Sequence, residues 1–376
     1  MVTPGDETEL SEAIASAVGG IAIRGGGTRP IGHSVEGTPL TTAGLTGIRL
    51  YEPGALTLVA GAGTPVAEIE ALLATENQRL AFEPMDHRRL LGTSGTPTIG
   101  GVVAGGVSGP RRIQAGACRD SLLGVRFVDG TGRIVKNGGR VMKNVTGYDL
   151  VKLMAGCRGT LGVLSEVSLK VLPTPAATAV VLIDGLSDTD ALAAMSAALG
   201  SPFDVSGAAH LQKGVAGTPT TMIRVEGFEE SVTYRSGRLK DLLGRFGETT
   251  IDTDPERAPA GWQSLRDVEA FAGRDGDVWR FSVKPTDAPG VAAALPGAEI
   301  VFDWGGGLIW ALVPTGTDAR AALSGRDGHA TLIRASEVTR AALPVFHPEP
   351  APLAALSAGL RAQFDPKSIL NPGLLG

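Results

Sequence analysis

Apolar and polar residues recur with two different periods along this chain, and the changes of period predict alternating strands and helices. Strands are predicted at residues 21–23, 48–51, 56–60, 124–128 and 133–135, and helices at 10–18, from 64 through 73, and at 148–154. From Val163 to Leu172, valines and leucines occupy most odd positions, while Glu166, Ser168 and Lys170 fall on the other face. That alternation predicts a half-buried strand.

The pattern of predicted strands and helices changes after Pro173 and Pro175. These two prolines predict a domain boundary. Strands at 179–183, 221–225, 278–283, 300–304 and 308–313 are separated by helices at 189–199, 229–246, 261–272 and 319–323. The pattern predicts an α+β domain with a mostly antiparallel sheet, without an internal repeat. The apolar, turn-rich segment 364–373 is predicted to pack on the first domain. The expected division is therefore 1–175, 176–344 and 345–376.

Composition excludes several classes of protein. The formal net charge of −5 argues against a nucleic-acid partner. The two cysteines, Cys118 and Cys157, are too few for an intrinsic iron–sulfur cluster or a disulfide framework. No basic and apolar leader begins the sequence, and no window of about 18 apolar residues follows. We therefore expect a cytoplasmic protein that meets a membrane only through partners.

Glycine is the compositional deviation, at 53 of 376 residues. Residues 92–109 read GTSGTPTIGGVVAGGVSG, and residues 23–28 read IRGGGT. Glycine allows a ligand to approach the main chain and allows several N–H groups to converge on an anion. Neither run has the spacing of a P-loop or a Rossmann fingerprint. The alternative for residues 25–27 is a tight turn, and the alternative for residues 92–109 is a flexible loop. The apolar residues within 92–109 favour instead a buried, loop-built phosphate site.

The order of motifs resembles a known family. It comprises a strand followed by RGGGT, then GTSGTPTIGG, SGPRR at 108–112, KNVTGYD at 143–149, GTLGVLSE at 159–166 and FDPKSILNPG at 364–373. This order resembles the PCMH-type FAD-binding flavoproteins of the vanillyl-alcohol oxidase superfamily, and within them the FAD-binding subunits of bacterial glycolate oxidases. The resemblance implies a two-subdomain FAD-binding domain plus an α+β cap domain.

The resemblance also implies an FAD site. Its residues would be Arg24, Gly25, Gly26, Gly27, Thr28, Pro84, Thr93, Ser94, Gly95, Thr96, Ile99, Gly100, Gly101, Gly162, Val163 and Leu164. Family members with covalent flavin carry a histidine where this chain has Thr28, so the resemblance implies non-covalent FAD. His33, five residues later, is interpreted as a loop histidine.

Catalytic residues are less well specified. The five histidines are isolated, without metal-ligand spacing, so no metal is expected. The catalytic residues are left unassigned; His347 is the best-placed candidate. Candidate cations for a substrate carboxylate are Arg224, Lys284, Arg334 and Arg340.

The resemblance implies a subunit that oxidises a small 2-hydroxy acid, glycolate, within a multi-subunit glycolate oxidase. Its partners would be a homologous larger FAD subunit and an iron–sulfur subunit, and it would be at most peripheral to the inner membrane through those partners. Two alternatives stay open: a self-sufficient FAD-dependent oxidase or dehydrogenase of another alcohol or hydroxy acid, and a non-catalytic scaffold subunit that holds FAD.

Overall fold

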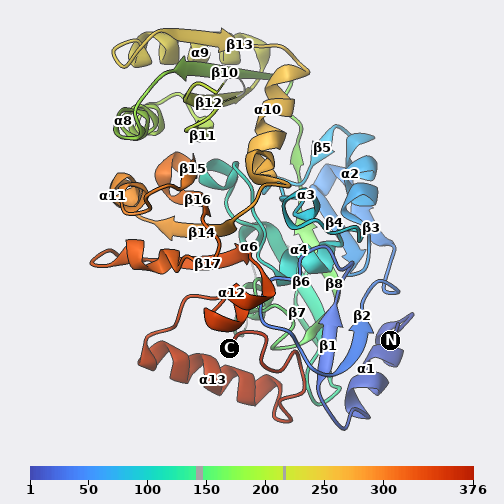
Figure 1. Cartoon of the computed structure of the whole chain (residues 1–376). Helices are drawn as coiled ribbons and strands as arrows, with labels where there is room; N and C mark the ends of the chain where they lie inside the picture. The colour runs from blue at the N-terminus through green and yellow to red at the C-terminus, as the bar shows by residue number, and fades with distance from the viewer. Residues whose placement is uncertain (141–146, 215–216) are drawn as a thin grey trace.

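The computed structural model describes residues 1–140, 147–214 and 217–376. Two parts of different architecture lie side by side (Figure 1). One, here called the N-terminal part, holds residues 1–173; the other, called the cap, is built on one large sheet. Of the motif at 143–149, residues 143–146 lie outside the described residues. None of the described helices is long and apolar enough to cross a bilayer.

The N-terminal part contains a parallel pair and a five-stranded antiparallel sheet. Helix α1 (Glu7–Ala15), capped by Asp6, buries Leu10 and Ile14 beside the parallel pair β1 (Ile21–Arg24) and β2 (Thr38–Thr41). The larger sheet has the order β3-β4-β8-β6-β7. Its strands are β3 (Ile48–Glu52), β4 (Thr57–Gly61), β8 (Val163–Lys170), β6 (Leu122–Val128) and β7 (Ile134–Gly138).

Strand β8 corrects the prediction of a half-buried strand. It is the central strand of its sheet, and residues on both of its faces are buried. Leu164 and Ser168, on the face expected to be exposed, are buried. The alternation of valine with polar residues indicated the strand but not its place in the sheet, because serine is small enough to be buried between layers.

Short helices connect and cover these strands. They are α2 (Val66–Ala74), α3 (Arg88–Leu91), α4 (Ile99–Ala104), α5 (Arg112–Ala115), α6 (Cys118–Ser121) and α7 (Leu150–Met154), while β5 (Gln78–Arg79) pairs with β9 (Leu172–Pro173). Helix α4 lies inside the glycine-rich stretch expected to form a loop. Thr98 caps it, and Ile99, Val102 and Val103 turn into the core, which explains why apolar residues are interleaved with the glycines.

The cap confirms the α+β class and the antiparallel sheet, but it also contains an internal repeat that the sequence did not predict. Its eight strands have the order β13-β10-β12-β11-β15-β16-β14-β17, and every adjacent pair is antiparallel. Each half follows a βαββαβ path with the same spatial order of strands. The halves share topology and not sequence, so no period was detectable.

The first half runs from β10 to β13 and the second from β14 to β17. The first comprises β10 (Ala177–Asp184), α8 (Asp188–Leu199), β11 (Val205–Leu211), β12 (Thr220–Gly227), α9 (Glu229–Leu243) and β13 (Thr249–Asp252). The second comprises β14 (Asp277–Val283), α11 (Ala288–Ala293), β15 (Glu299–Asp303), β16 (Leu308–Val313), the 3-10 turn η5 (Ala319–Leu323) and β17 (Gly328–Arg334). Helix α10 (Arg257–Arg266) connects them.

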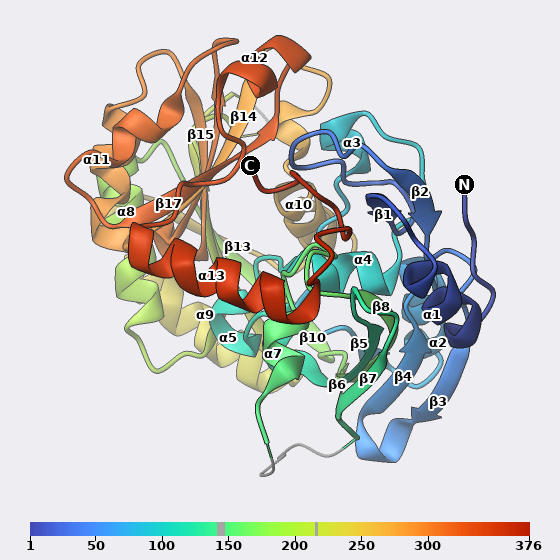
Figure 2. The same cartoon turned by 90° about the horizontal axis from the view of Figure 1, so that it is seen from below.

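After the cap, the chain returns to the N-terminal part. Helices α12 (Glu337–Ala342) and α13 (Ala351–Phe364) lead to a tail that pairs with the first strand, where Ile21 bridges Leu370 in parallel. Figure 2 shows the C-terminus in the middle of the molecule, between the cap and the N-terminal part. The tail thus completes the side of the N-terminal part that faces the cap.

Candidate functional site

A cleft of about 1180 Å³ lies where the two parts and the tail meet. Small-molecule pockets typically measure about 300–1,000 Å³, so this cleft is large enough for a large small-molecule ligand. Its wall combines the loop after β1, helix α4, the turn before β8, helix α12 and the tail. The site is therefore assembled from segments that are far apart in the sequence.

The loop after β1 presents free hydrogen-bond donors. Among the described residues, the N–H groups of Gly25, Gly26, Gly27 and Thr28 have no acceptor within the protein. All four residues line the cleft, and nothing lies within 4 Å of the position that a Cβ on Gly27 would occupy. A run of unpaired N–H groups at a cleft wall fits a diphosphate, which accepts hydrogen bonds from several donors at once.

The two glycine-rich runs are packed against each other, backbone on backbone. A Cβ on Gly26 would lie 1.5 Å from the carbonyl oxygen of Thr96, and one on Gly95 would lie 1.8 Å from the carbonyl oxygen of Gly26. Neither contact tolerates a side chain. These glycines therefore set the position of the loop, whereas Gly27 and Gly101 leave space for a ligand.

Ten of the sixteen predicted cofactor residues line the cleft: Arg24, Gly25, Gly26, Gly27, Thr28, Gly100, Gly101, Gly162, Val163 and Leu164. Six are not among its lining residues: Pro84, Thr93, Ser94, Gly95, Thr96 and Ile99. Of these, Gly95 and Thr96 support the first loop, and the Thr93 hydroxyl donates to the carbonyl of Thr28 at 2.9 Å. The sequence pattern could not separate residues that touch a ligand from those that support its loop.

Two further arginines lie in the cleft wall: Arg29, which the sequence offers as a possible charge partner for a diphosphate, and Arg158, which it does not single out. Arg29 donates to the carbonyls of Gly105 (3.2 Å) and Gly101 (3.3 Å), so its guanidinium lies on α4. Arg158 has a left-handed backbone (φ 55°) and stacks 4.5 Å above the ring of Phe346. Burial and neighbouring arginines lower the pKa of Arg29 to about 9, and burial lowers that of Arg158 to about 10. Both stay cationic at neutral pH.

The tail contributes Asn371 to the same wall. Its side-chain oxygen accepts from the N–H of Ile23 at 2.7 Å, and its amide nitrogen donates to the carbonyl of Arg158 at 2.9 Å. Asn371 therefore ties the strand before the first glycine run to the turn before β8. Its own left-handed backbone (φ 47°) is a conformation that asparagine tolerates better than most residues.

The second half of the cap adds a further cation beside this wall. Arg280 on β14 and Arg112 on α5 both stack on Trp304, with guanidinium carbons 5.2 and 4.6 Å from the ring centroid. The Trp304 indole is fixed by donating to the carbonyl of Gly109 at 3.0 Å. Burial, with Arg112 and Arg158 nearby, lowers the pKa of Arg280 to about 10. Among the described residues, Arg280 makes no ion pair with a carboxylate.

Two histidines line the cleft, and His347 does not. His87 is buried, and this burial together with Arg29 lowers its pKa to about 3, so it stays neutral. His33 lies near the tail, where its backbone N–H donates to the carbonyl of Leu374 at 3.0 Å. His347 accepts from the N–H of Ala330 at 3.5 Å and is not among the lining residues. The described residues contain no cluster of metal-ligating side chains.

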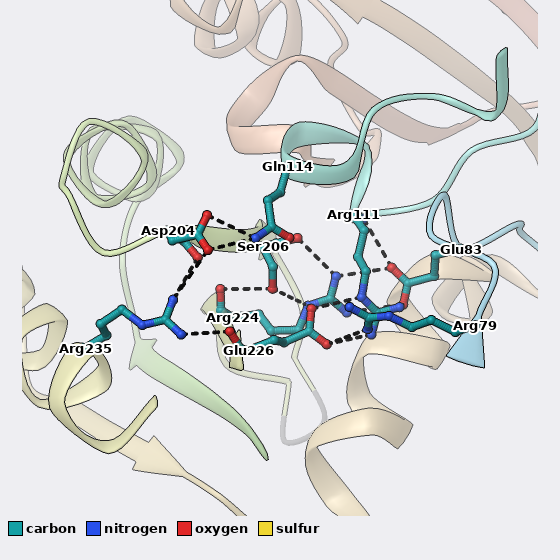
Figure 3. A network of polar contacts seen from close by, with 9 residues as sticks. All are labelled: Arg79, Glu83, Arg111, Gln114, Asp204, Ser206, Arg224, Glu226 and Arg235. Carbon is teal, nitrogen blue, oxygen red and sulfur yellow. Dashed lines mark hydrogen bonds and ion pairs between the residues drawn. The ribbon is translucent and has the colours of Figure 1, made fainter. Parts of the chain in front are cut away.

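The first half of the cap is fixed to the N-terminal part by a buried ion network (Figure 3). Arg224 on β12 donates to both carboxylate oxygens of Glu83 at 3.2 Å. Glu226 on the same strand accepts from Arg111 (2.7 Å) and Arg79 (3.1 Å). The paired arginines hold the pKa of the Glu83 and Glu226 carboxyls below the usual range despite burial.

The cations considered for substrate binding have other contacts. Arg224 belongs to the network, Lys284 pairs with Asp327 at 2.6 Å on the surface, and Arg334 donates to the carbonyl of Phe271 at 2.7 Å. Arg340 alone lines the cleft, and it donates to the carbonyl of Pro30 at 2.9 Å.

Comparisons with known proteins agree with this geometry. Residues 1–138 match the family described as FAD binding domain. Glycolate oxidase subunit GlcE of Escherichia coli (strain K12) is 37% identical over 91% of this chain and 88% of its own length. Glycolate oxidase subunit GlcD of Bacillus subtilis (strain 168) is 31% identical over 41% of this chain and 32% of its own. A solved alkyldihydroxyacetonephosphate synthase superposes with a TM-score of 0.69 over 99% of this chain and 76% of its own, at 16% identity, which shows the fold alone.

Proposed function

Since the chain belongs to the PCMH-type FAD-binding flavoproteins, we propose that it is the FAD-binding subunit of a multi-subunit glycolate oxidase. In this role it takes part in oxidising glycolate to glyoxylate and passes the electrons to an iron–sulfur partner subunit. FAD, when bound, supplies the two-electron acceptor for that oxidation. We propose the same division into domains as above, with 1–175 and 345–376 holding FAD and 176–344 acting as the cap.

The observation that carries the proposal is the chemistry of the cleft wall. Four adjacent unpaired N–H groups of the RGGGT loop lie there with Arg29 and Arg158. Such a surface stabilises anions. We propose that Gly25–Thr28 bind the diphosphate without covalent attachment of the flavin. Arg24 would add charge, and Gly100, Gly101 and the turn 162–164 would contact the rest of the cofactor. His87 would form part of the wall without adding charge.

The cap would supply the site for the substrate carboxylate. Arg280 is not itself a lining residue, but it is near enough to Arg29 and His87 of the cleft wall for its positive charge to lower their pKa values. It is cationic and makes no ion pair with a carboxylate of the described residues, and we propose that it pairs with an anion held in the cleft. Glycolate is a small anion that fits this requirement. We assign no catalytic base, because His347 lies outside the cleft lining and His87 is too weakly basic to take a proton at neutral pH.

Two variants at one position test the cofactor site. Gly101 lines the cleft with φ outside the left-handed region, and a Cβ there meets only the Thr98 hydroxyl, at 3.1 Å. We expect Gly101→Asp to purify without its flavin spectrum, because its carboxylate repels the diphosphate, while Gly101→Ala keeps FAD. A flavin-free wild-type chain that added FAD does not stabilise would contradict the proposal.

The activity is tested by assaying glycolate-dependent dye reduction with the chain alone and with the assembled enzyme. We expect turnover in the assembly and at most a trace with the chain alone. Equal turnover by the isolated chain would instead support a self-sufficient enzyme. Unchanged turnover of an assembly carrying flavin-free Gly101→Asp would support a scaffold role.

A further inference from the structure

Trp304, in the turn between β15 and β16 of the cap, has a backbone conformation that a bulky side chain disfavours. It opens the 3-10 turn η4 (Trp304–Gly306) with a left-handed φ of 54°, which is rare for a residue of its size. The turn is held by close packing on α8, since a Cβ on Gly306 would lie 2.4 Å from the Leu192 side chain. Backbone strain of this kind persists where the surroundings enforce it, and it concentrates at ligand sites. The strained backbone therefore points to a functional role for the Trp304 side chain.

The Trp304 side chain contacts the N-terminal part and the cap at once. Its indole N–H donates to the carbonyl of Gly109, the last residue of the second glycine-rich run, at 3.0 Å. Its ring centroid lies 4.6 Å from the guanidinium carbon of Arg112 on α5 and 5.2 Å from that of Arg280 on β14. The tryptophan thus fixes how Arg280 lies relative to the N-terminal part.

Arg280 is held by aromatic rings and not by a carboxylate. Trp310, its cross-strand neighbour on β16, is the second ring, with its centroid 5.9 Å from the guanidinium carbon. Among the described residues, the Arg280 guanidinium donates no hydrogen bond and makes no ion pair. The carboxyl group of Asp303 is close enough to act on it electrostatically, yet it accepts from the backbone N–H of Trp304 at 2.7 Å instead. An aromatic face attracts a cation without neutralising its charge or occupying its N–H groups, so Arg280 keeps its donors for an external anion.

We propose that Trp304 is a positioning residue for the substrate carboxylate, because its ring holds the Arg280 guanidinium beside the cleft wall with its hydrogen-bond donors free. The inference rests on the proposed function, in which Arg280 pairs with that carboxylate. A bidentate pair with a carboxylate requires the guanidinium plane to be oriented, and ring faces restrict that plane without competing for its donors. The hydrogen bond to Gly109 ties this orientation to the glycine-rich run whose Gly100 and Gly101 line the cleft. Trp304 thereby aligns the carboxylate site of the cap with the cofactor wall of the N-terminal part.

The first half of the cap contains a matched tryptophan–arginine pair without this role. Arg224 stacks on Trp262, with its guanidinium carbon 4.3 Å from the ring centroid, and Trp262 is 1% exposed. The donors of Arg224 are already used, because they bind the Glu83 carboxylate and the carbonyl of Ser206. Replacing Trp262 should therefore lower stability without changing the binding of an anion in the cleft.

The test measures the binding of acetate, a carboxylate that lacks the oxidisable hydroxyl, to the full chain loaded with FAD. Calorimetric titration at constant ionic strength should give a dissociation constant about tenfold higher for Trp304→Leu than for the wild type. Trp304→Phe keeps an aromatic face and should stay within about threefold of the wild type. Trp262→Leu is the matched control, and it should bind acetate like the wild type while unfolding at a lower urea concentration. Trp310→Leu removes the more distant ring, should raise the constant about threefold, and replaces Trp304→Leu if that variant does not fold.

A double variant distinguishes positioning from general damage. In the assembled enzyme, we expect Trp304→Leu to lower kcat/KM for glycolate about tenfold, and its combination with Arg280→Met to be no worse than Arg280→Met alone. Losses that multiply in the double variant, wild-type acetate binding by Trp304→Leu, or an equal loss in Trp262→Leu would refute the positioning role and leave the proposed function intact. If Arg280→Met binds acetate as the wild type does, or if the wild type binds none, the carboxylate site of the proposed function is itself refuted.

Discussion

The two halves of the cap have the same strand order and meet the N-terminal part in opposite ways. In the first half, Arg224 is buried and fully paired with Glu83, so its charge fastens the sheet. In the second half, Arg280 stacks on Trp304 and makes no ion pair with a carboxylate of the described residues. An arginine that is paired within the protein stabilises it, whereas one held without a partner can bind a ligand. The comparison indicates that the first half holds the cap in place, and it supports the proposal that Arg280 of the second half binds the substrate.

The largest expected effect is on stability, from the paired arginine. Arg224→Met should lower the free energy of unfolding by about 3–5 kcal/mol, because it leaves Glu83 and Glu226 without one of their cationic partners in a buried network. Urea titration followed by tryptophan fluorescence measures it. Arg238→Met, which removes an exposed ion pair with Asp241, is the control and should cost less than about 1 kcal/mol. If the two variants lowered the free energy of unfolding equally, the first half of the cap would not be what holds the cap on the N-terminal part.

The unpaired arginine should give the opposite result. Arg280→Met should lower kcat/KM for glycolate in the assembled enzyme about 100-fold, since a charge-assisted bond to the carboxylate is lost. The free energy of unfolding should stay the same or rise, because a desolvated charge near Arg112 and Arg158 is removed. Arg280→Lys should recover part of the activity. Full activity of Arg280→Met would show that the second half does not hold the substrate.

A smaller effect is expected where the tail meets the first glycine run and the turn before β8. Asn371→Ala removes the acceptor for Ile23 and the donor to Arg158, so we expect FAD to bind about tenfold more weakly. Titration of the apoprotein by flavin fluorescence measures it. Asn371→Asp keeps the acceptor and should fall between the wild type and the alanine variant. An unchanged affinity for FAD in both variants would show that the tail does not contribute to the cofactor site.

The smallest expected effect is a pH dependence at the junction of the halves. Burial raises the pKa of Asp303, at the end of β15, to about 7 from an ordinary value near 3.8. The folded state therefore binds this proton more tightly than the unfolded state, and the stability it contributes is full below pH 4 and lost as the pH rises to 7. Asp303→Asn should be more stable than the wild type above pH 7, by about 1–3 kcal/mol. Denaturant titrations should show a gain that is absent at pH 3.5, grows between pH 4 and pH 7, and is constant above pH 7.

Local signals in the sequence predicted much of this molecule. The glycine runs, the α+β class and most strands follow from patterns a few residues long, and the RGGGT loop lines the cleft as its glycines indicate. The residues that sequence reasoning missed, Arg158, Arg280 and Asn371, are brought together only by tertiary contacts. A single arginine carries no local signal of whether it will be paired.

The sequence also could not show which glycines are needed for backbone packing and which leave room for a ligand. Gly26 and Gly95 are required because backbone lies against backbone, whereas Gly101 has room for a Cβ and excludes only a larger or negatively charged side chain when a ligand is bound. All three look alike in the sequence. The helix α4 was missed for a related reason, because two glycines in six residues suppress the helical signal while Thr98 and the buried valines still favour it.

The hydrogen bond between Ile23 and Asn371 joins residues 348 positions apart. During synthesis at about 5–20 residues per second, roughly 20–70 s separate the emergence of these two partners from the peptidyl transferase centre. Throughout that interval the RGGGT loop exists without one wall of its cleft, while the whole cap is being made. On the proposed site, cofactor capture is consequently one of the last events in the biogenesis of this chain.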